Sequence, residues 1–280
     1  DELPKPIATE VCFVTAIYGS SPLSSDTPYD VTSLRESNPS YKFFLYTNMS
    51  ELDAPGWIKV VKTFDFRRSV TQSRWAKFMG WKDQQIRDCP VVFYHDAWQS
   101  PGMESRANIL DVARRIKESP YGLAQKKHPL GGGVMEEFER VREKNKDIIM
   151  NVEASTSWLN AQPDFSNDCV VWENDFFGYD PNNRHFQRVT QFFWDHYSRE
   201  IDSWRDQPLW CHAIRKFGIS PVLMTNRQPN ALFDRHKELK GHHSHTYAGN
   251  LDKAPELDVI FIVKDKSLGS AQARAVLVSE

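Results

Sequence analysis

The chain has 280 residues, which is enough to bury a sizeable core in one large domain or two closely packed ones. Its formal net charge of −2 argues against the basic surface that nucleic-acid-binding proteins use. No apolar run approaches the ~18 residues of a membrane-spanning helix, so we expect no membrane span. The first residues lack the charged and apolar regions of a signal peptide, and we therefore expect a cytoplasmic protein.

Apolar segments in the first half alternate with helix-sized intervals. We predict strands over 11–17, 42–47, 57–61 and 91–95, and a helix over 70–88. Strands joined by such connections usually pair in parallel. The sequence therefore predicts an α/β fold with a Rossmann-type, mostly parallel central sheet flanked by helices.

The second half is less regular and holds more helical patterns than strand patterns. We predict helices over 104–117, 134–146, 186–200 and 205–217, and strands over 169–172 and 257–263. The strand over 169–172 leads into Glu173, Asn174 and Asp175, which we expect to form an acidic turn. No internal repeat or low-complexity segment is present, so we expect a single domain over 1–280.

The four cysteines are Cys12, Cys89, Cys169 and Cys211. Their spacing contains no CxxC motif, and three of them adjoin apolar segments. We therefore expect reduced, buried thiols.

The run Val91–Trp98 is the most informative segment of the chain. Its apolar and aromatic residues predict a buried strand that brings Asp96 to its carboxyl end. Open α/β sheets bind their ligands outside that end. A carboxylate there can hold a hard divalent cation, Mn²⁺ or Mg²⁺, together with a phosphorylated substrate. Alternatively, Asp96 caps the turn that follows the strand.

Two basic residues, Arg74 and Lys77, lie about one turn apart on the helix predicted over 70–88. Residues at this spacing share a helix face, so both side chains could meet the phosphate oxygens of a donor. The alternative is that they belong to a solvated helix face.

Asp206 lies near the start of the helix predicted over 205–217, where the helix dipole favours its ionised form. An ionised carboxylate beside an acceptor hydroxyl could act as the general base of an inverting transfer. The alternative is a helix cap partnered by Arg205. Glu153 is the next candidate for the base.

A histidine-rich segment, His242–His245, offers His243 and His245 as further metal ligands, because neutral imidazole binds transition metals well. The alternative is a polar loop.

Several short motifs occur in an order that is more specific than any one of them. The motifs are Thr15–Gly19, Phe43–Asn48, Trp57–Val60, Arg74 with Lys77, Tyr94–Ala97, His128-Pro129 before Glu136-Glu137, and Ser203–Gln207. This order resembles a glycosyltransferase-like family long catalogued as a domain of unknown function, with members in plants and microbes. The resemblance covers roughly residues 11–225.

The resemblance implies a GT-A-like nucleotide-sugar fold, often with a divalent cation. It implies transfer of a sugar from a UDP-sugar donor to a hydroxyl of a glycan acceptor. The chain's size is also similar to that of glycosyltransferases of algal viruses, which makes xylose one candidate sugar and the host cytoplasm the expected location of a viral member.

Under this resemblance, about residues 7–102 bind the nucleotide and about residues 103–280 serve the acceptor. The expected donor-binding residues are Thr15, Ala16, Tyr18, Arg74, Lys77, Tyr94 and Asp96. The expected acceptor-binding residues are His128, Trp172, Asp175, Arg205 and Gln207. The chain departs from the family pattern at Asn48, where Asp is common, and at Gly131-Gly132, where a basic residue is usual. These departures put base or ribose recognition and the phosphate contacts of that loop in doubt.

Two other functional classes remain open at this point. A metal-dependent phosphoesterase could use Asp96 and the histidine segment, but such enzymes usually need several carboxylates at dinuclear spacing. A non-catalytic carbohydrate-binding protein could use some of the nine tryptophans. The all-β pattern expected of such a module conflicts with the helices predicted over 104–117 and 186–217.

Overall fold

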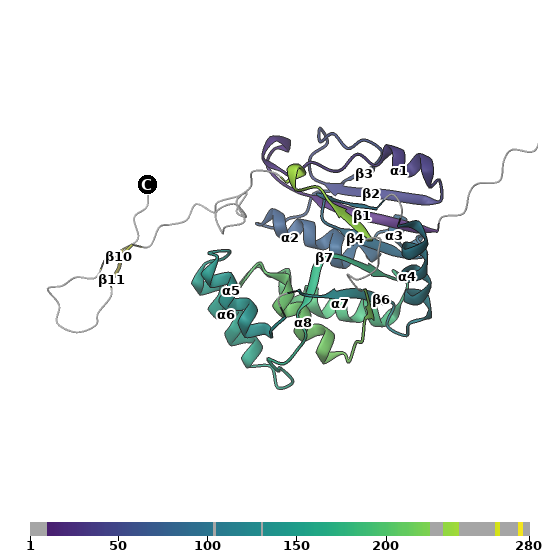
Figure 1. Ribbon diagram of the computed structural model, residues 1–280. Coiled ribbons are helices and arrows are strands. Elements are labelled where there is room, and N and C mark those ends of the chain that lie inside the picture. Colours follow the sequence, from purple (N-terminus) through teal and green to yellow (C-terminus); the bar gives the residue numbers. More distant parts are fainter. Residues whose placement is uncertain are drawn as a thin grey trace, which may run out of the picture.

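A seven-stranded sheet forms the centre of the molecule (Figure 1), in the order β3-β2-β1-β4-β7-β6-β8. The computed structural model describes residues 10–102, 105–129, 131–224 and 232–240, with the backbone of 261–263 and 274–276. In sheet order the strands are β3 (Ile58–Val61), β2 (Tyr41–Thr47), β1 (Val11–Ile17), β4 (Val92–His95), β7 (Trp172–Tyr179), β6 (Leu123–Lys127) and β8 (Val222–Leu223). The strands predicted in the first half are confirmed to within one residue at either end.

The sheet is mostly parallel, as predicted. Strands β3, β2, β1 and β4 are parallel to one another, and β7 is antiparallel to both of its neighbours. The acidic turn expected after residue 172 is wrong, because Glu173, Asn174 and Asp175 lie inside β7. Pairing with β4 on one side and β6 on the other, together with burial of Phe177, outweighs the local turn preference of these polar residues.

Helical segments lie between the strands in the described residues. They are η1 (Pro22–Ser24), α1 (Thr32–Ser37), α2 (Ser69–Arg74), η2 (Trp75–Met79), η3 (Gly80–Lys82), α3 (Gln84–Arg87), α4 (Arg106–Glu118), α5 (Val134–Glu143), α6 (Ile149–Asn160), α7 (Arg184–Tyr197), α8 (Asp206–Lys216) and η4 (Lys237–Leu239). The four helices predicted in the second half correspond to α4, α5, α7 and α8. The helix predicted over 70–88 is instead broken into α2, a π-helical turn, a 3₁₀ turn and α3.

Both faces of the sheet are covered. On one face, Phe177 stacks on Phe78 of η2, with ring centroids 5.7 Å apart. On the other face, the next residue, Gly178, lies under α4. A Cβ atom at Gly178 would come within 2.7 Å of the Ile116 side chain and 2.8 Å of the Phe93 ring. Glycine therefore permits the close approach of α4 to the sheet.

The largest hydrophobic cluster extends through residues of both halves of the chain, which supports a single domain. At its centre Phe13 stacks on Phe43 and Phe93, with centroid distances of 4.9 and 5.8 Å. A smaller cluster, including Phe138 and Leu159, joins α5, α6 and α8.

Two short strand pairs lie outside the main sheet. β5 (Gln99–Pro101) pairs with β9 (Phe233–Arg235), and β10 (Phe261–Val263) pairs with β11 (Arg274–Val276). Of the strand predicted over 257–263, only β10 falls within the described residues. Every helix in the described part of the chain is too short or too polar to cross a bilayer.

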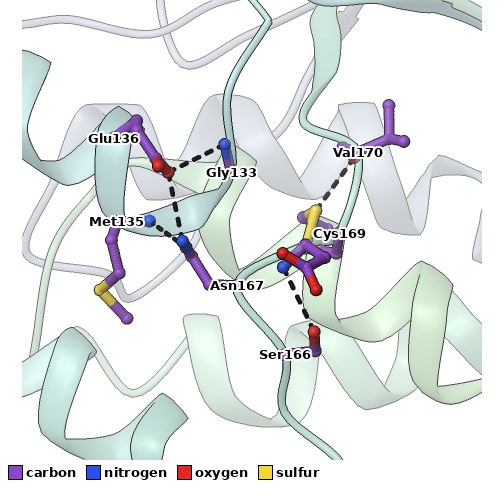
Figure 2. The surroundings of a disulfide bond; sticks show 9 residues. Gly133, Met135, Glu136, Ser166, Asn167, Cys169 and Val170 are labelled. Atoms are coloured by element: carbon purple, nitrogen blue, oxygen red, sulfur yellow. Dashed lines mark hydrogen bonds between the residues drawn. A yellow bond between two sulfur atoms is a disulfide. The ribbon is translucent and has the colours of Figure 1, made fainter.

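The cysteines form two disulfides, Cys12–Cys89 and Cys169–Cys211, so the prediction of reduced thiols is wrong. Cys12 lies on β1, and Cys89 lies just before the neighbouring strand β4. The second bond joins the segment before β7 to α8 (Figure 2). The Cα atoms are 5.9 and 6.0 Å apart, which are ordinary disulfide separations. Partners 77 and 42 residues apart are brought together by tertiary structure and leave no local spacing signal.

Candidate active site

The candidate site lies at the carboxyl ends of β1 and β4. β1 pairs with β2 on one side and with β4 on the other, so the strand order reverses here. Open α/β sheets bind ligands at such a switch point. Tyr18 and Gly19 follow β1, and Asp96 follows β4. The Asn48 side chain fixes the end of β1, because it donates to the Gly19 carbonyl at 2.8 Å and accepts from the Gly19 N–H at 3.1 Å.

Three carboxylates, from Asp96, Glu173 and Asp175, gather at this edge of the sheet. The backbone N–H of Asp96 donates to the Asp175 carbonyl at 2.8 Å, so β7 begins beside the end of β4. Arg235 bridges two of the side chains, at 2.8 Å to Asp175 and 3.2 Å to Glu173. Lys126 forms a second ion pair with Glu173 at 2.5 Å. Two cations thus partly neutralise a cluster of three acids.

Asp175 is the most strongly perturbed member of this cluster. Burial raises its pKa to about 7, and repulsion from Glu173 and Asp96 acts in the same direction, against the attraction of Arg235. Its Oδ2 atom accepts a hydrogen bond from Gln99 at 2.9 Å. Its Oδ1 atom is buried and has no hydrogen-bond partner among the described residues. A carboxyl group that ionises near neutral pH and keeps an unshared oxygen is suited to accepting a proton.

A second charged group joins the helical segment after β3 to the start of α8. The Asp206 carboxylate lies 2.7 Å from Arg74 Nε and 3.2 Å from Lys77 Nζ. The side chains of Lys77 and Asp206 are 2% and 5% exposed, and that of Arg74 is 16% exposed. Of the two cations, Arg74 is therefore the one that a ligand can reach more readily.

This pairing determines the charge states of the group. Burial alone would raise the pKa of Asp206, but the attraction of Lys77, Arg74 and Arg205 outweighs it and holds that pKa far below its usual range. Burial lowers the pKa of Lys77, and Asp206 opposes that shift. A fully ionised carboxylate clamped by two cations is a weak base. This geometry favours a positioning role for Asp206 over the catalytic role expected from the sequence.

Glu200 holds the start of α2 in place. Its carboxylate accepts the backbone N–H groups of Arg67 at 2.8 Å and Arg68 at 2.9 Å. The Arg68 guanidinium in turn donates to the Asp202 carbonyl at 2.9 Å. The loop before α8 is thereby tied to the helix that carries Arg74.

Glu200→Ala is expected to lower the free energy of unfolding by about 1–3 kcal/mol, because two buried backbone donors lose their acceptor. Thermal and denaturant unfolding monitored by circular dichroism would measure this. Glu118→Ala is the matched control, since that carboxylate is 59% exposed and pairs with Arg114 on the surface of α4. A Glu200→Ala variant as stable as Glu118→Ala would show that these hydrogen bonds contribute little.

The predicted acceptor-side residues include both sequence neighbours of Asp206. Arg205 pairs with Glu137 of α5 at 3.1 Å and also donates to the Gln207 side chain. The Gln207 amide donates to the Trp172 carbonyl at 3.3 Å. His128 follows β6, and its backbone N–H donates to the Val171 carbonyl at 3.0 Å. The structure therefore brings this predicted set together near the start of β7.

The predicted donor-side residues differ in how accessible they are to a ligand. The side chains of Thr15 and Tyr94 are 0% and 1% exposed, so they lie beneath the site and cannot contact a donor. Lys77 Nζ lies 5.1 Å from the centre of the Tyr94 ring. Tyr18 is buried, with a hydroxyl that has no partner among the described residues, and Ala16 is half-buried.

Glu153 does not belong to the charged edge. It lies on the exposed surface of α6, which packs against α5 and α8 rather than against the strand ends. An exposed helix surface outside the switch point does not favour a catalytic base. His243 and His245 lie outside the described residues.

No group of three or more His, Cys, Asp or Glu side chains within the described residues is arranged to hold a metal ion. A magnesium-type ion, however, is often held by one or two carboxylates plus substrate phosphates. Asp96, which follows β4 at the switch point of the sheet, is the carboxylate that fits this more limited requirement.

Sequence reasoning missed Arg235, Lys126 and Gln99 as parts of the site. Lys126 lies on β6, which was not predicted, and Arg235 reaches the site from β9, far away in the sequence. Gln99 lies on β5 and follows Asp96 by three residues, and this closeness in the sequence is the one signal that could have indicated its role.

Comparison of the sequence with models of known protein families and with curated proteins gives no match. The family resemblance therefore stays a prediction, and the functional argument depends on the geometry of the site.

Proposed function

We propose that this protein is a GT-A-like glycosyltransferase that moves a sugar from a UDP-sugar donor to a hydroxyl of a glycan. The observation that carries the proposal is the placement of Asp96 and Asp175 at the switch point of the sheet, with Arg74 close enough to Asp96 for their charges to interact. Sugar transfer from a nucleoside diphosphate needs charge stabilisation for the departing diphosphate and a base for the attacking hydroxyl. The carboxyl edge of the sheet offers Arg74 for stabilising the diphosphate and Asp175 as the base.

The donor diphosphate is proposed to lie over the end of β4, near Asp96 and Arg74. A guanidinium matches the geometry of phosphate oxygens and can bind two of them at once. Lys77 is too deeply buried for the direct phosphate contact expected from the sequence. Its role in the proposal is to hold Asp206, and through it Arg74, in position.

A divalent cation, Mn²⁺ or Mg²⁺, fits the same place, with Asp96 as its carboxylate ligand and the donor phosphates as further ligands. When bound, such an ion would neutralise the charge of the leaving diphosphate. The ammonium and guanidinium groups of Lys126 and Arg235 already offset part of the acidic charge.

Asp175, rather than Asp206 or Glu153, is proposed as the general base of an inverting transfer. Its pKa of about 7 places the carboxylate near the acidity at which general bases are most effective. A base at this position would accept the proton of the acceptor hydroxyl as that oxygen attacks the sugar carbon opposite the diphosphate.

Asp96→Asn is expected to weaken binding of UDP in the presence of Mn²⁺ by roughly 30-fold, or about 2 kcal/mol, because a charged contact is lost. Isothermal titration calorimetry with UDP, UMP and inorganic phosphate would measure this. Asp88→Asn is the matched control, since Asp88 is exposed and precedes the amino end of β4. Failure of the wild-type protein to bind UDP would overturn the donor assignment, and hydrolysis of phosphate esters without transfer would favour a phosphoesterase.

The disulfides alter the proposed location. The expectation of a cytoplasmic protein was consistent with reduced cysteines, but disulfides persist mainly in oxidising compartments. We therefore propose that the protein acts in an oxidising compartment. Mass spectrometry of alkylated protein, purified without reductant from its native source, would test this.

A further inference from the structure

A groove of about 420 Å³ lies between the end of β6 and the segment that leads into β7. This volume is within the roughly 300–1,000 Å³ of ligand-binding pockets. One wall is formed by His128 and the glycine loop 131–133, and the other by residues 167–171, including Asp168 and Val170. Neither the donor nor the base proposed above uses this groove.

The groove is built on a well-anchored loop (Figure 2). The Glu136 carboxylate accepts the Gly133 N–H at 2.9 Å, and the Asn167 side chain accepts the Met135 N–H at 2.8 Å. A Cβ atom on Gly133 would lie only 2.0 Å from the Asn167 carbonyl, so the two walls meet at a point where only glycine fits. The disulfide from Cys169 ties the second wall to α8. These contacts favour a preformed site.

The groove is connected to the carboxylate edge through the start of β7. His128 and Val171, one from each wall, are joined by a backbone hydrogen bond of 3.0 Å. From Val171 the chain enters β7 and reaches Asp175 after four residues, which span roughly 13 Å of extended strand. This distance is longer than one pyranose ring. A ligand that reaches both the groove and Asp175 must therefore have more than one sugar unit.

The chemistry of the lining indicates an uncharged, hydroxyl-rich ligand. Glu136 and Asp168 supply carboxylates, Lys127 an ammonium group and Asn167 an amide. Gly131 and Gly132 are exposed in the glycine loop. Sugar hydroxyls both donate and accept hydrogen bonds and can use all of these groups. The two carboxylates disfavour an acidic ligand.

We propose that this groove binds the neutral oligosaccharide part of the acceptor and places its terminal sugar at Asp175. The inference depends on the proposed glycosyltransferase function, and it adds the acceptor's minimum length and its lack of acidic groups.

Val170→Trp tests the inference by filling the groove. Val170 lines it and is 42% exposed, so a larger side chain can be accommodated without repacking the core. Ile149→Trp is the control, because Ile149 is 61% exposed on α6 and does not line the groove. Asp168→Ala is a second variant that removes one polar contact from an exposed position.

The probes are maltotriose, cellotriose, xylotriose, mannotriose and acidic trigalacturonic acid, observed by saturation-transfer NMR. We expect at least one neutral trisaccharide to bind, with more than a tenfold loss in Val170→Trp, several-fold loss in Asp168→Ala and no change in Ile149→Trp. UDP affinity, measured by calorimetry, should be equal in all four proteins.

Absence of binding by every neutral trisaccharide, preference for trigalacturonic acid, or full binding by both groove variants would each overturn the inference. UDP binding distinguishes the two proposals. A wild-type protein that binds UDP but no trisaccharide refutes the groove alone, whereas trisaccharide binding without UDP binding refutes the donor assignment.

Discussion

Asp206→Asn is expected to destabilise the protein by about 3–5 kcal/mol, because it leaves the buried cations of Arg74 and Lys77 without their shared counter-charge. Asparagine has nearly the same size and shape as aspartate, so the loss of stability reports the loss of the negative charge. Since the pKa of Asp206 is held below its usual range, its stabilising contribution is present above pH 3.8 and is lost as the pH falls from there. The difference in the free energy of unfolding between the variant and the wild type should therefore become smaller at acid pH.

Denaturant unfolding at pH 7 and pH 3 would measure both effects. Asp164→Asn is the matched control, because its ion pair with Lys216 is exposed at the surface and should contribute about 1 kcal/mol or less. A variant with normal stability and a large loss of transfer rate would contradict the positioning role. It would return Asp206 to the role of general base that its place at a helix start first indicated.

The first half of the fold could be predicted because its signals are local. The strands around Phe13, Phe44 and Phe93 are apolar runs bounded by turn residues. They are apolar throughout because both faces of these strands are buried. The break of the helix over 70–88 could not be predicted in the same way. Its π-helical turn packs against α7 and β1, which are distant in the sequence.

The second half depends more on tertiary contacts. Glu173 and Asp175 have low strand preference, yet pairing with β4 and β6 places them in β7. The Cys12–Cys89 bond needs the adjacency of β1 and β4, which residue spacing does not encode. Arg235 likewise reaches Asp175 only because β9 pairs with β5.

The position of the candidate site could be predicted from the sequence, but the roles of its individual residues could not. Asp96 follows a central strand in both the sequence and the structure. The assignment of Asp206 as a base relied on the helix dipole, whereas two nearby cations dominate its environment. The raised pKa of Asp175 depends on burial and on Glu173 and Asp96, and neither effect is visible in its turn-like local sequence.

Asp175→Asn is expected to lower the rate of sugar transfer by about 10²–10⁴-fold, the usual contribution of a general base. In the wild-type protein, kcat/KM should rise as the pH increases through about 7, because the base acts in its ionised form. The variant should lose this dependence. UDP binding should persist at saturating nucleotide, since Arg74 and Asp96 remain. Transfer from UDP-sugars between pH 5 and 9 would measure the profile.

The same substitution should stabilise the fold above neutral pH. Because the pKa of Asp175 rises from 3.8 to about 7 on folding, the folded state binds more protons than the unfolded state between those values. The contribution of Asp175 to the stability of the wild-type protein therefore falls as the pH rises through this range, by up to about 4 kcal/mol. Asp175→Asn removes that loss, so its melting temperature should exceed that of wild type at pH 8 and match it near pH 4. Asp88→Asn is the control, since Asp88 is exposed and precedes the amino end of β4. A variant that loses both activity and stability at pH 8 would instead make Asp175 a structural residue.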